Sequence, residues 1–207
     1  MGGIMGIHTK QKLIKIGLAA VAVAALVAVP ASGQAGELNF QATRAETPGA
    51  EIFYTAPGAP RDIQELLDST LEFNPAIIAL CNLGFGDVEI TSYLAVSIGS
   101  VSLLCGDAYS GYVHIRSNHG SEWQQIVDQS GGGANWDDLM DFAAKSALWV
   151  PSEGYPKDVG DGKLCYTAPI QIKNQQGQVI RNMSPTIIAS LNNRKVITAI
   201  PTTNPSC

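Results

Sequence analysis

Two histidines, His114 and His119, are the residues in this sequence best suited to chemistry, and both lie in the stretch YVHIRSNHGSEWQQI. Histidine ordinarily exchanges its proton near neutral pH, which makes it the side chain most used for proton transfer. The remaining histidine, His8, lies near the N-terminus. Two imidazoles five residues apart indicate either an acid and a base that share one substrate or two structural residues.

Helix geometry decides whether the two rings can meet. On a regular helix, residues five apart point about 140° away from each other, so convergence requires the helix to end near Asn118. Gly120 is typical of the residue after a helix, and Ser121 with Gln124 forms a capping-box pattern that predicts a second helix. His119 would then lie at a joint, beside free backbone amides that can bind a phosphate.

Metal and nucleophile chemistry are less well supported by the sequence. A metal site would need Glu122 or Asp107 as a third ligand beside the histidines, and that spacing matches no dedicated motif. No G-x-S-x-G segment is present, and no C-x-x-C pair occurs. The sequence therefore predicts no metal site and no cofactor.

The N-terminal segment has the pattern of a secretory signal peptide. Lys10, Lys12 and Lys15 precede the uncharged run Ile16 to Pro30, and the small residues of PASGQAGE follow. A basic region, an apolar region and a small-residue cleavage zone describe a leader over residues 1–35. The apolar run is short for a membrane span. We expect a secreted or extracytoplasmic protein with no stable membrane span after the leader is removed.

Charge is unevenly distributed along the rest of the chain. Without the three leader lysines, 10 basic residues face 18 acidic ones, a formal charge of −8. Residues 36–106 carry a charge of −7, whereas the segment from Lys163 onward has five basic and no acidic residues. The acidic balance argues against general nucleic-acid binding, while the basic tail indicates an anionic partner.

The four cysteines predict two disulfides. An even count in an exported chain is typical of a disulfide framework, and four cysteines allow three pairings. We favour Cys81–Cys105 and Cys165–Cys207, since each pair lies within its own half of the chain.

The first half of the chain predicts an arm followed by helices. Residues 36–59 are rich in Ala, Gly, Pro and Thr and predict a linker. Residues 60–73 show helical spacing, and Asn74 with Pro75 predicts the start of a helix that ends at Gly84. The apolar stretch 87–106 predicts a buried helix. Residues 60–106 are therefore predicted to form a small helical module.

The second half predicts an α+β domain over residues 107–207. Helices are expected at 110–120, 121–129 and 136–148, the last beginning with a capping box of Asn135 and Asp138. The period then changes to two in the stretches 164–173, 179–191 and 195–202, which predicts strands joined by the turns NQQGQ and NNR. The fold class is α+β, with helices followed by a C-terminal antiparallel sheet.

Two short motifs in this domain resemble a known group of bacterial enzymes. The segment HIRSNHG, followed at the far end by KVITAIPT, resembles the ribonuclease-toxin domains of the barnase, EndoU, colicin and RelE-like group. The resemblance covers roughly Tyr112 to Thr202. The sequence is also similar to uncharacterised exported actinobacterial proteins that contain GNWDDLM and end in VITAYPT.

The resemblance implies a set of site residues. It implies an acid/base pair and groups that contact the phosphate, namely His119, His114, Thr198, Lys195 and Arg181. It also implies substrate-binding roles for Arg116, Arg194 and Tyr166. The sequence departs from the family at Ile200, where an aromatic is usual, and at Asn118, where the toxin domains often carry Arg. Ile200 provides no ring on which an RNA base could stack, and Asn118 provides no positive charge next to the site.

The resemblance implies an exported, metal-independent endoribonuclease-like domain. One group would deprotonate a ribose 2′-OH that attacks the phosphate, and another would protonate the leaving 5′-oxygen. The partners would be RNA and an immunity or inhibitor protein. The alternative is a non-catalytic secreted or surface binding protein with the same fold. The placement of the side chains distinguishes the enzyme from the binding protein, because an enzyme needs His119, Thr198 and a cation around one cleft.

Overall fold

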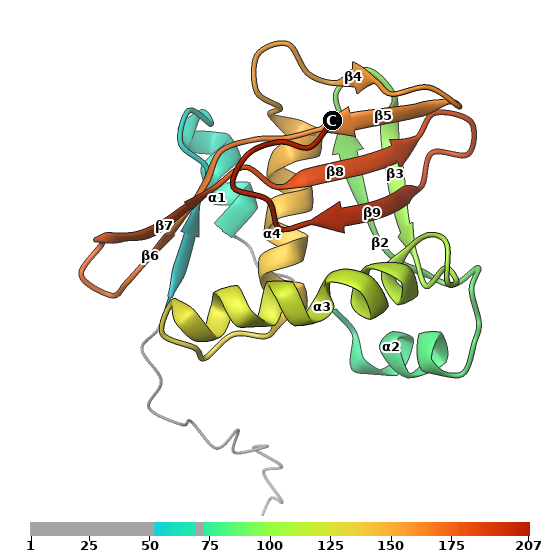
Figure 1. Cartoon of the computed structure of the whole chain (residues 1–207), viewed down its shortest axis with the longest axis horizontal. Helices are drawn as coiled ribbons and strands as arrows, with labels where there is room; N and C mark the ends of the chain where they lie inside the picture. The colour runs from blue at the N-terminus through green and yellow to red at the C-terminus, as the bar shows by residue number, and fades with distance from the viewer. Residues whose placement is uncertain (1–51, 69–72) are drawn as a thin grey trace, which may run out of the picture. The chain divides into compact units, whose positions relative to one another are not determined.

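A computed structural model describes residues 52–68 and 73–207 of this chain. The expected signal peptide and the expected linker up to residue 51 lie outside the described residues. Within them, helices precede a C-terminal region of antiparallel strands, as Figure 1 shows, and the predicted α+β class is confirmed.

The helices begin where local capping signals predict. Asn74 accepts a hydrogen bond from the backbone N–H of Ala76 (2.9 Å), with Pro75 at the first helical position. A capping box starts the last helix, and the backbone N–H of Asn135 donates to the Asp138 carboxylate (3.2 Å). These side chains satisfy amides that have no partner within the helix. The described helices are α1 (Arg61–Asp68), α2 (Pro75–Asn82), α3 (Tyr112–Gln129) and α4 (Trp136–Trp149).

The predicted buried helix over residues 87–106 is wrong. This segment is a β-hairpin of β2 (Glu89–Ala95) and β3 (Gly99–Leu104), which pair antiparallel. Tyr93, Val101 and Leu103 are buried while their neighbours along each strand are more exposed. The hydroxyl residues that interrupt the apolar run occupy the less buried positions, so the pattern is that of strands with one face on the core.

The expected linker also contains regular structure at its end. Residues Phe53–Thr55 form β1, which pairs antiparallel with β6 (Ile170–Lys173). Tyr54 is buried and its ring packs 5.5 Å from that of Phe142. The last part of the predicted arm is therefore held by the sheet and the core.

The strands after α4 form two sheets that share one long, bent hairpin. β5 (Lys163–Tyr166) pairs with β8 (Thr186–Ser190), and β6 pairs with β7 (Val179–Met183) in the same register. Pro169 and Pro185 lie in the two breaks between these strands. Proline has no N–H to donate to a neighbouring strand, so both strands of the hairpin are interrupted opposite each other. Before the break the hairpin belongs to the sheet of β5 and β8, and after it to the sheet of β6 and β7.

The outcome is a three-stranded sheet in the order β1-β6-β7 and a four-stranded sheet in the order β4-β5-β8-β9. The remaining strands are β4 (Lys157–Asp158) and β9 (Val196–Ile200). In Figure 1, α4 stands behind the four-stranded sheet and α3 runs below β9. The largest fully buried side chains, among them Trp123, Phe142 and Tyr166, come from both helices and the sheet.

The expected domain boundary near Asp107 is not a boundary in the structure. The described residues, 52–68 and 73–207, all fall in one unit by their contacts. The backbone N–H of Ser102 on β3 donates to the carbonyl of Arg194 beside β9 (2.9 Å), and Val113 N–H on α3 donates to the Cys105 carbonyl (2.9 Å). The helical module expected over 60–106 is therefore part of the same body as the α+β region.

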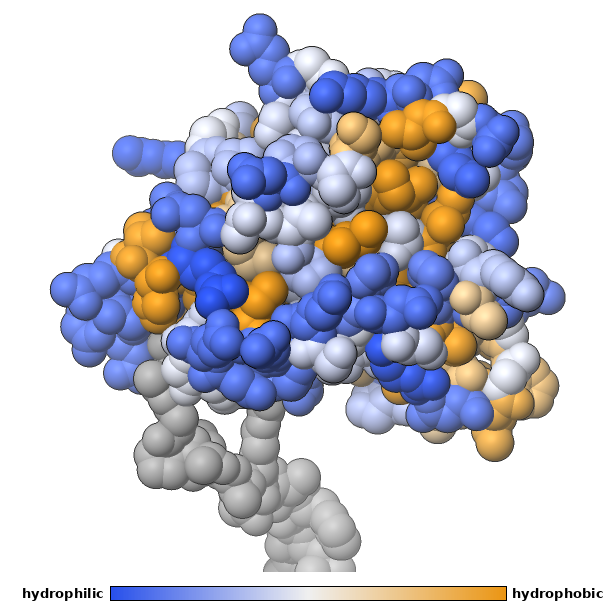
Figure 2. Space-filling model, in the orientation of Figure 1, coloured by the Kyte–Doolittle hydropathy of each residue, from blue (hydrophilic) through white to orange (hydrophobic). Residues whose placement is uncertain are grey.

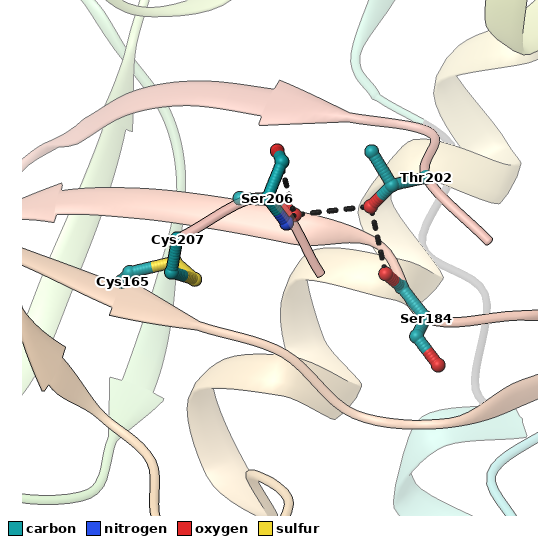
Figure 3. Close-up of a disulfide and its surroundings, with 6 residues drawn as sticks. Cys165, Ser184, Thr202, Ser206 and Cys207 are labelled. Atoms are coloured by element: carbon teal, nitrogen blue, oxygen red, sulfur yellow. Dashed lines mark hydrogen bonds between the residues drawn. A yellow bond between two sulfur atoms is a disulfide. The ribbon is translucent and has the colours of Figure 1, made fainter. Parts of the chain in front are cut away.

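Both predicted disulfides are present. Cys81–Cys105 joins α2 to the end of β3, and Cys165–Cys207 ties the C-terminus to β5. Hydrogen bonds support the C-terminal tail (Figure 3), because Thr202 donates to the Ser184 carbonyl (2.8 Å) and Ser206 N–H donates to a threonine hydroxyl on β8 (3.0 Å). Among the described residues, no helix has the length and apolar character needed to cross a membrane.

Candidate functional site

His114 and His119 lie on one uninterrupted helix, so the predicted break at Gly120 is wrong. α3 runs from Tyr112 to Gln129, and Gly120 is buried within it. A Cβ on Gly120 would lie at an ordinary contact distance of 3.8 Å from the Trp136 ring, so this position lies at the contact between α3 and α4 with room for a small side chain. The structure nevertheless brings the histidines together, with ring centroids 6.3 Å apart and nearly perpendicular planes.

His114 is held by the loop that precedes α3. Its Nδ1 lies 2.9 Å from the Ala108 carbonyl and also 2.9 Å from Nδ2 of Asn118. A carbonyl only accepts, so the bond to Ala108 requires the proton on Nδ1, and the Asn118 amide then donates to the His114 carbonyl (3.1 Å) rather than to the ring. In that tautomer Nε2 carries the lone pair and is the nitrogen available for proton transfer.

His119 is oriented by a carboxylate on the next turn of α3. Its Nδ1 lies 3.0 Å from Oε2 of Glu122, and its side chain is 20% exposed. The predicted phosphate cradle at this position is wrong, because residues 122–124 are interior to the helix and their amides belong to its hydrogen-bond ladder. What the structure offers instead is an imidazole with its Nδ1 fixed by Glu122.

The two sequence motifs lie beside each other in space. Gly111 N–H, at the start of α3, donates to the Ile197 carbonyl on β9 (3.0 Å). The Trp123 indole N–H donates to the Ala199 carbonyl (3.1 Å). Both histidines lie between Gly111 and Trp123 on the helix. Thr198 lies between Ile197 and Ala199 on the strand. The helix therefore covers the free edge of β9.

Thr198 does not present its hydroxyl as the resemblance implies. Its side chain is buried, and the hydroxyl has no hydrogen-bond partner among the described residues. Thr198 pairs with Ile188 on β8, which pairs with Cys165 on β5. Three aligned residues share one face of the sheet, so Thr198 lies on the face that carries the Cys165–Cys207 disulfide.

Lys195 is the implied cation that lies on the His114 side of the molecule. It lines a small polar pocket beside the N-terminus of α3, together with Asp107. Backbone hydrogen bonds from Tyr109 and Ser110 hold the pKa of Asp107 below its ordinary value, and the positive charges of Lys195 and His114 act in the same direction. Lys195 and His114 therefore both lie close to one carboxylate.

The other implied cations lie elsewhere. Arg181 on β7 donates to the Gln129 side chain at the C-terminal end of α3 (2.7 Å), at the opposite end of the helix from His114. Arg116 donates to Asn82 on α2. Arg194 occupies an exposed turn with a positive φ of 51°. The set of cations predicted around one phosphate is not assembled.

Tyr166 is not available to a substrate. Its side chain is fully buried, and its hydroxyl donates to the Val96 carbonyl in the turn between β2 and β3 (3.1 Å). Burial raises the pKa of this phenol. Tyr166 is therefore a core side chain with a satisfied hydroxyl, and the substrate-binding role that the resemblance implies does not fit its position.

The sequence reasoning missed most of the pocket beside Lys195. Sequence spacing predicts Asp107 only as a metal ligand, and no motif predicts a role for Asp87 or Ser110. The described residues contain no group of three or more His, Cys, Asp or Glu side chains that could hold a metal ion. A local signal existed in the glycines at 86, 106 and 111, which mark tight turns on both sides of the pocket.

Comparisons with known proteins assign no function. No protein-family model matches this chain. The chain is 28% identical over 101 residues to an uncharacterised protein of Mycobacterium tuberculosis, in the strains CDC 1551 / Oshkosh and H37Rv. The match covers 42% of this chain and 38% of that relative, so it spans well under half the length of either protein.

Proposed function

We propose that this chain is an extracytoplasmic endoribonuclease-like domain whose acid/base pair is His114 and His119. The supporting observation is the arrangement of the pair, with rings 6.3 Å apart on a helix that lies along β9, where the second motif falls. Each Nδ1 is engaged by an oxygen acceptor, and neither Nε2 has a hydrogen-bond partner among the described residues. Two oriented imidazoles with free Nε2 atoms are suited to general acid–base catalysis.

In this mechanism the two rings act on opposite sides of one phosphodiester. One Nε2 accepts the proton of the ribose 2′-OH, whose oxygen attacks phosphorus as the bond to the 5′-oxygen breaks. The other Nε2 donates a proton to that leaving oxygen. Each nitrogen must come within about 2.6–3.2 Å of its oxygen, which two neighbouring rings can satisfy around one phosphate.

The structure favours different roles for the two rings. Glu122 can balance the charge of a protonated His119, so we assign His119 as the general acid. The partner of His114 is a neutral carbonyl, and its neutral ring with a free Nε2 lone pair suits the general base. Lys195 and His114 both act on the Asp107 carboxylate, so Lys195 lies near His114 and would stabilise the charged phosphorane. Arg181 and Tyr166 have no role in this site.

A non-catalytic extracytoplasmic binding domain is the second candidate. The observation that favours it is the local charge, because Glu122 and Asp107 lie beside the histidines and a single implied cation accompanies them. Carboxylates repel a phosphate, and the buried Thr198 hydroxyl supplies no contact to it. In this case the histidines serve the structure of α3 and its preceding loop.

The deciding experiment is RNA cleavage by the purified mature protein in EDTA, with total RNA and tRNA as substrates. We compare wild type with His119→Ala, His114→Ala and Ser117→Ala, an exposed position on the same helix. Each histidine variant is expected to lose about 10²–10⁴-fold of the cleavage rate, and the control should keep it. Products should carry 2′,3′-cyclic phosphate, and a 2′-deoxy substrate should stay intact.

Two results would overturn the proposal. If wild type cleaves none of the RNAs, or if both histidine variants retain full activity, the binding-domain candidate replaces it. Thermal melts of each variant accompany the assay, because His119 is partly exposed and its removal should change stability little. If His119→Ala melts early, cleavage would be measured in His119→Gln instead, because glutamine keeps a polar side chain at position 119.

A further inference from the structure

The α2 helix has an apolar stripe on its exposed side. Four exposed residues of α2 and its C-cap recur at the spacing of one helical face, namely Ala76, Ala79, Leu80 and Leu83. The other side of α2 faces inward, where Cys81 is buried and disulfide-bonded to Cys105 at the end of β3. A helix that is apolar on every side is normally buried on every side. The disulfide instead fixes α2 at the surface with a second apolar face uncovered.

Two loops beside α2 add large exposed side chains to this surface. Leu83 and Phe85 in the loop after α2 are 74% and 56% exposed, and Tyr109 in the loop before α3 is 83% exposed. The two loops lie side by side, because Gly106 N–H donates to the Gly86 carbonyl (2.8 Å). Figure 2 shows apolar surface at the corner of the molecule that α2 occupies in Figure 1. We call this surface the α2 corner and define it by its large exposed side chains, Leu80, Leu83, Phe85 and Tyr109.

The charged groups that border the α2 corner are of both signs. Residues 74–86 carry no charge at all, and the next two charged residues along the chain, Asp87 and Glu89, are exposed carboxylates. A cation comes from α3, because the Arg116 guanidinium donates to Asn82 on α2. The corner is therefore an uncharged apolar surface that is bordered by carboxylates and a guanidinium.

A lipid surface with zwitterionic headgroups matches this arrangement. Its hydrocarbon boundary takes up exposed apolar side chains, and the binding free energy rises with the apolar area that is buried. Aromatic rings favour the headgroup level, and the face of a tyrosine ring attracts a quaternary ammonium. The ammonium of phosphatidylcholine can also meet the Asp87 carboxylate, while its phosphate can meet Arg116. An anionic headgroup without an ammonium would be repelled by the carboxylates.

A second copy of this chain matches the same surface less well. A two-fold contact between copies would place each α2 corner against its own image. Asp87 and Glu89 of both copies would then border one interface, and like charges oppose such a contact. The mixed border therefore favours a zwitterionic lipid surface as the partner.

We propose that the α2 corner attaches this domain to a zwitterionic lipid surface. Leu83 and Phe85 enter the hydrocarbon boundary, and Tyr109 lies at the level of the headgroups. The helix α2 lies along the interface, with its disulfide-bonded side toward the protein. The contact uses neither of the proposed catalytic histidines, so it goes beyond the cleavage function and applies equally to the binding-domain candidate.

The test is flotation of the full mature protein with vesicles of phosphatidylcholine and, separately, of phosphatidylglycerol. Wild type is expected to float with phosphatidylcholine and to bind phosphatidylglycerol about tenfold more weakly, because an anionic surface repels the carboxylates. A rise in salt concentration should leave binding to phosphatidylcholine nearly unchanged, because burial of apolar side chains is not screened by salt.

Substitutions in the α2 corner locate the contact. Leu83→Ser and Phe85→Ser should each weaken phosphatidylcholine binding about tenfold, because each removes one large apolar side chain from the hydrocarbon boundary. Phe53→Ser is the matched control, since Phe53 is 48% exposed on β1 in the three-stranded sheet, and it should leave binding unchanged. Thermal melts verify that each variant is folded. If a corner variant melts early, Tyr109→Ser replaces it in the assay.

Three results would overturn the proposal. The first is a wild type that does not float with phosphatidylcholine, or corner variants that float as well as wild type. The second is preferential binding to phosphatidylglycerol that high salt abolishes, because the basic strands would then make the contact. The third comes from sedimentation equilibrium without vesicles. A dimer that Leu83→Ser dissociates would make the α2 corner a contact between copies, whereas a monomeric wild type is the expected result.

Discussion

Trp123 on α3 and Ala199 on β9, 76 residues apart in sequence, are joined by a buried hydrogen bond of 3.1 Å from the indole N–H to the carbonyl oxygen. The bond satisfies a group on the free edge of β9 and fixes how the histidine-bearing helix lies against the strand. The same contact therefore supports both the fold and the candidate site.

Trp123→Phe should lower the free energy of unfolding by about 1–3 kcal/mol, because the Ala199 carbonyl is left buried without its donor. Trp123→Ala should cost about 3–5 kcal/mol, since it also leaves a cavity. Urea denaturation measures both. Trp149→Phe is the control, because the indole of Trp149 makes no hydrogen bond to the described residues and is only partly buried; an equal loss there would show that the bond to Ala199 contributes nothing.

Gly120→Ala tests whether α3 is continuous. A Cβ at this position would make ordinary contacts at 3.6 Å to Arg116 and 3.8 Å to Trp136, and alanine has the higher helix propensity. We expect the free energy of unfolding to rise by about 0.5–1 kcal/mol, as measured by denaturant titration. A loss of more than about 1 kcal/mol would indicate a left-handed residue here and a broken helix.

Local sequence signals predicted the elements whose ends are fixed by neighbouring residues. Asn74 with Pro75 and Asn135 with Asp138 start helices because their own side chains and backbone satisfy the first amides. The strands after residue 163 were predicted from their period of two. Disulfide pairing followed from keeping each bridge within its own half of the chain, and the structure confirms it.

The misses came from contacts distant in sequence. Gly120 favours a helix end locally, but α3 continues through it and the position is buried beside Trp136. The hairpin at 89–104 looked helical because its exposed positions also carry apolar residues such as Leu94 and Val96. The pocket could not be predicted, because Lys195 reaches it only through the pairing of Ser102 with Lys195 across more than ninety residues.

The Cys165–Cys207 disulfide should stabilise the domain by restraining the unfolded chain. It closes a separation of 42 residues, for which loop entropy gives about 4 kcal/mol as an upper expectation. Cys207→Ser should therefore lower the free energy of unfolding by about 2–4 kcal/mol. Mass spectrometry of the non-reduced protein should find no free thiols and a peptide linking Cys165 to Cys207. Free thiols in the wild type would contradict the expectation.

The buried carboxylate of Asp141 should give the fold a distinctive pH dependence. It accepts hydrogen bonds from the Tyr93 hydroxyl (2.9 Å) and from Lys145 Nζ, and is almost completely buried. Burial raises the pKa of Asp141 above its ordinary value, while the charge and hydrogen bond of Lys145 and the bond from Tyr93 act in the opposite direction. In the window between the ordinary and the raised value, the folded state therefore binds more protons than the unfolded state.

Stability contributed by this proton is complete below the ordinary pKa of 3.8 and is lost as the pH rises through the raised folded value. The slope cannot exceed about 1.4 kcal/mol per pH unit for one group. Asp141→Asn removes the titration, so the stability of wild type relative to this variant should decrease as the pH rises through that window and then stay constant. Urea denaturation of both proteins from pH 3.5 to 7.5 measures the difference between their free energies of unfolding. Exposed carboxylates such as Asp107 contribute equally to both proteins, so their opposite pH dependence cancels in this difference. A difference that grows with pH would mean that the Lys145 and Tyr93 contacts outweigh burial at this site.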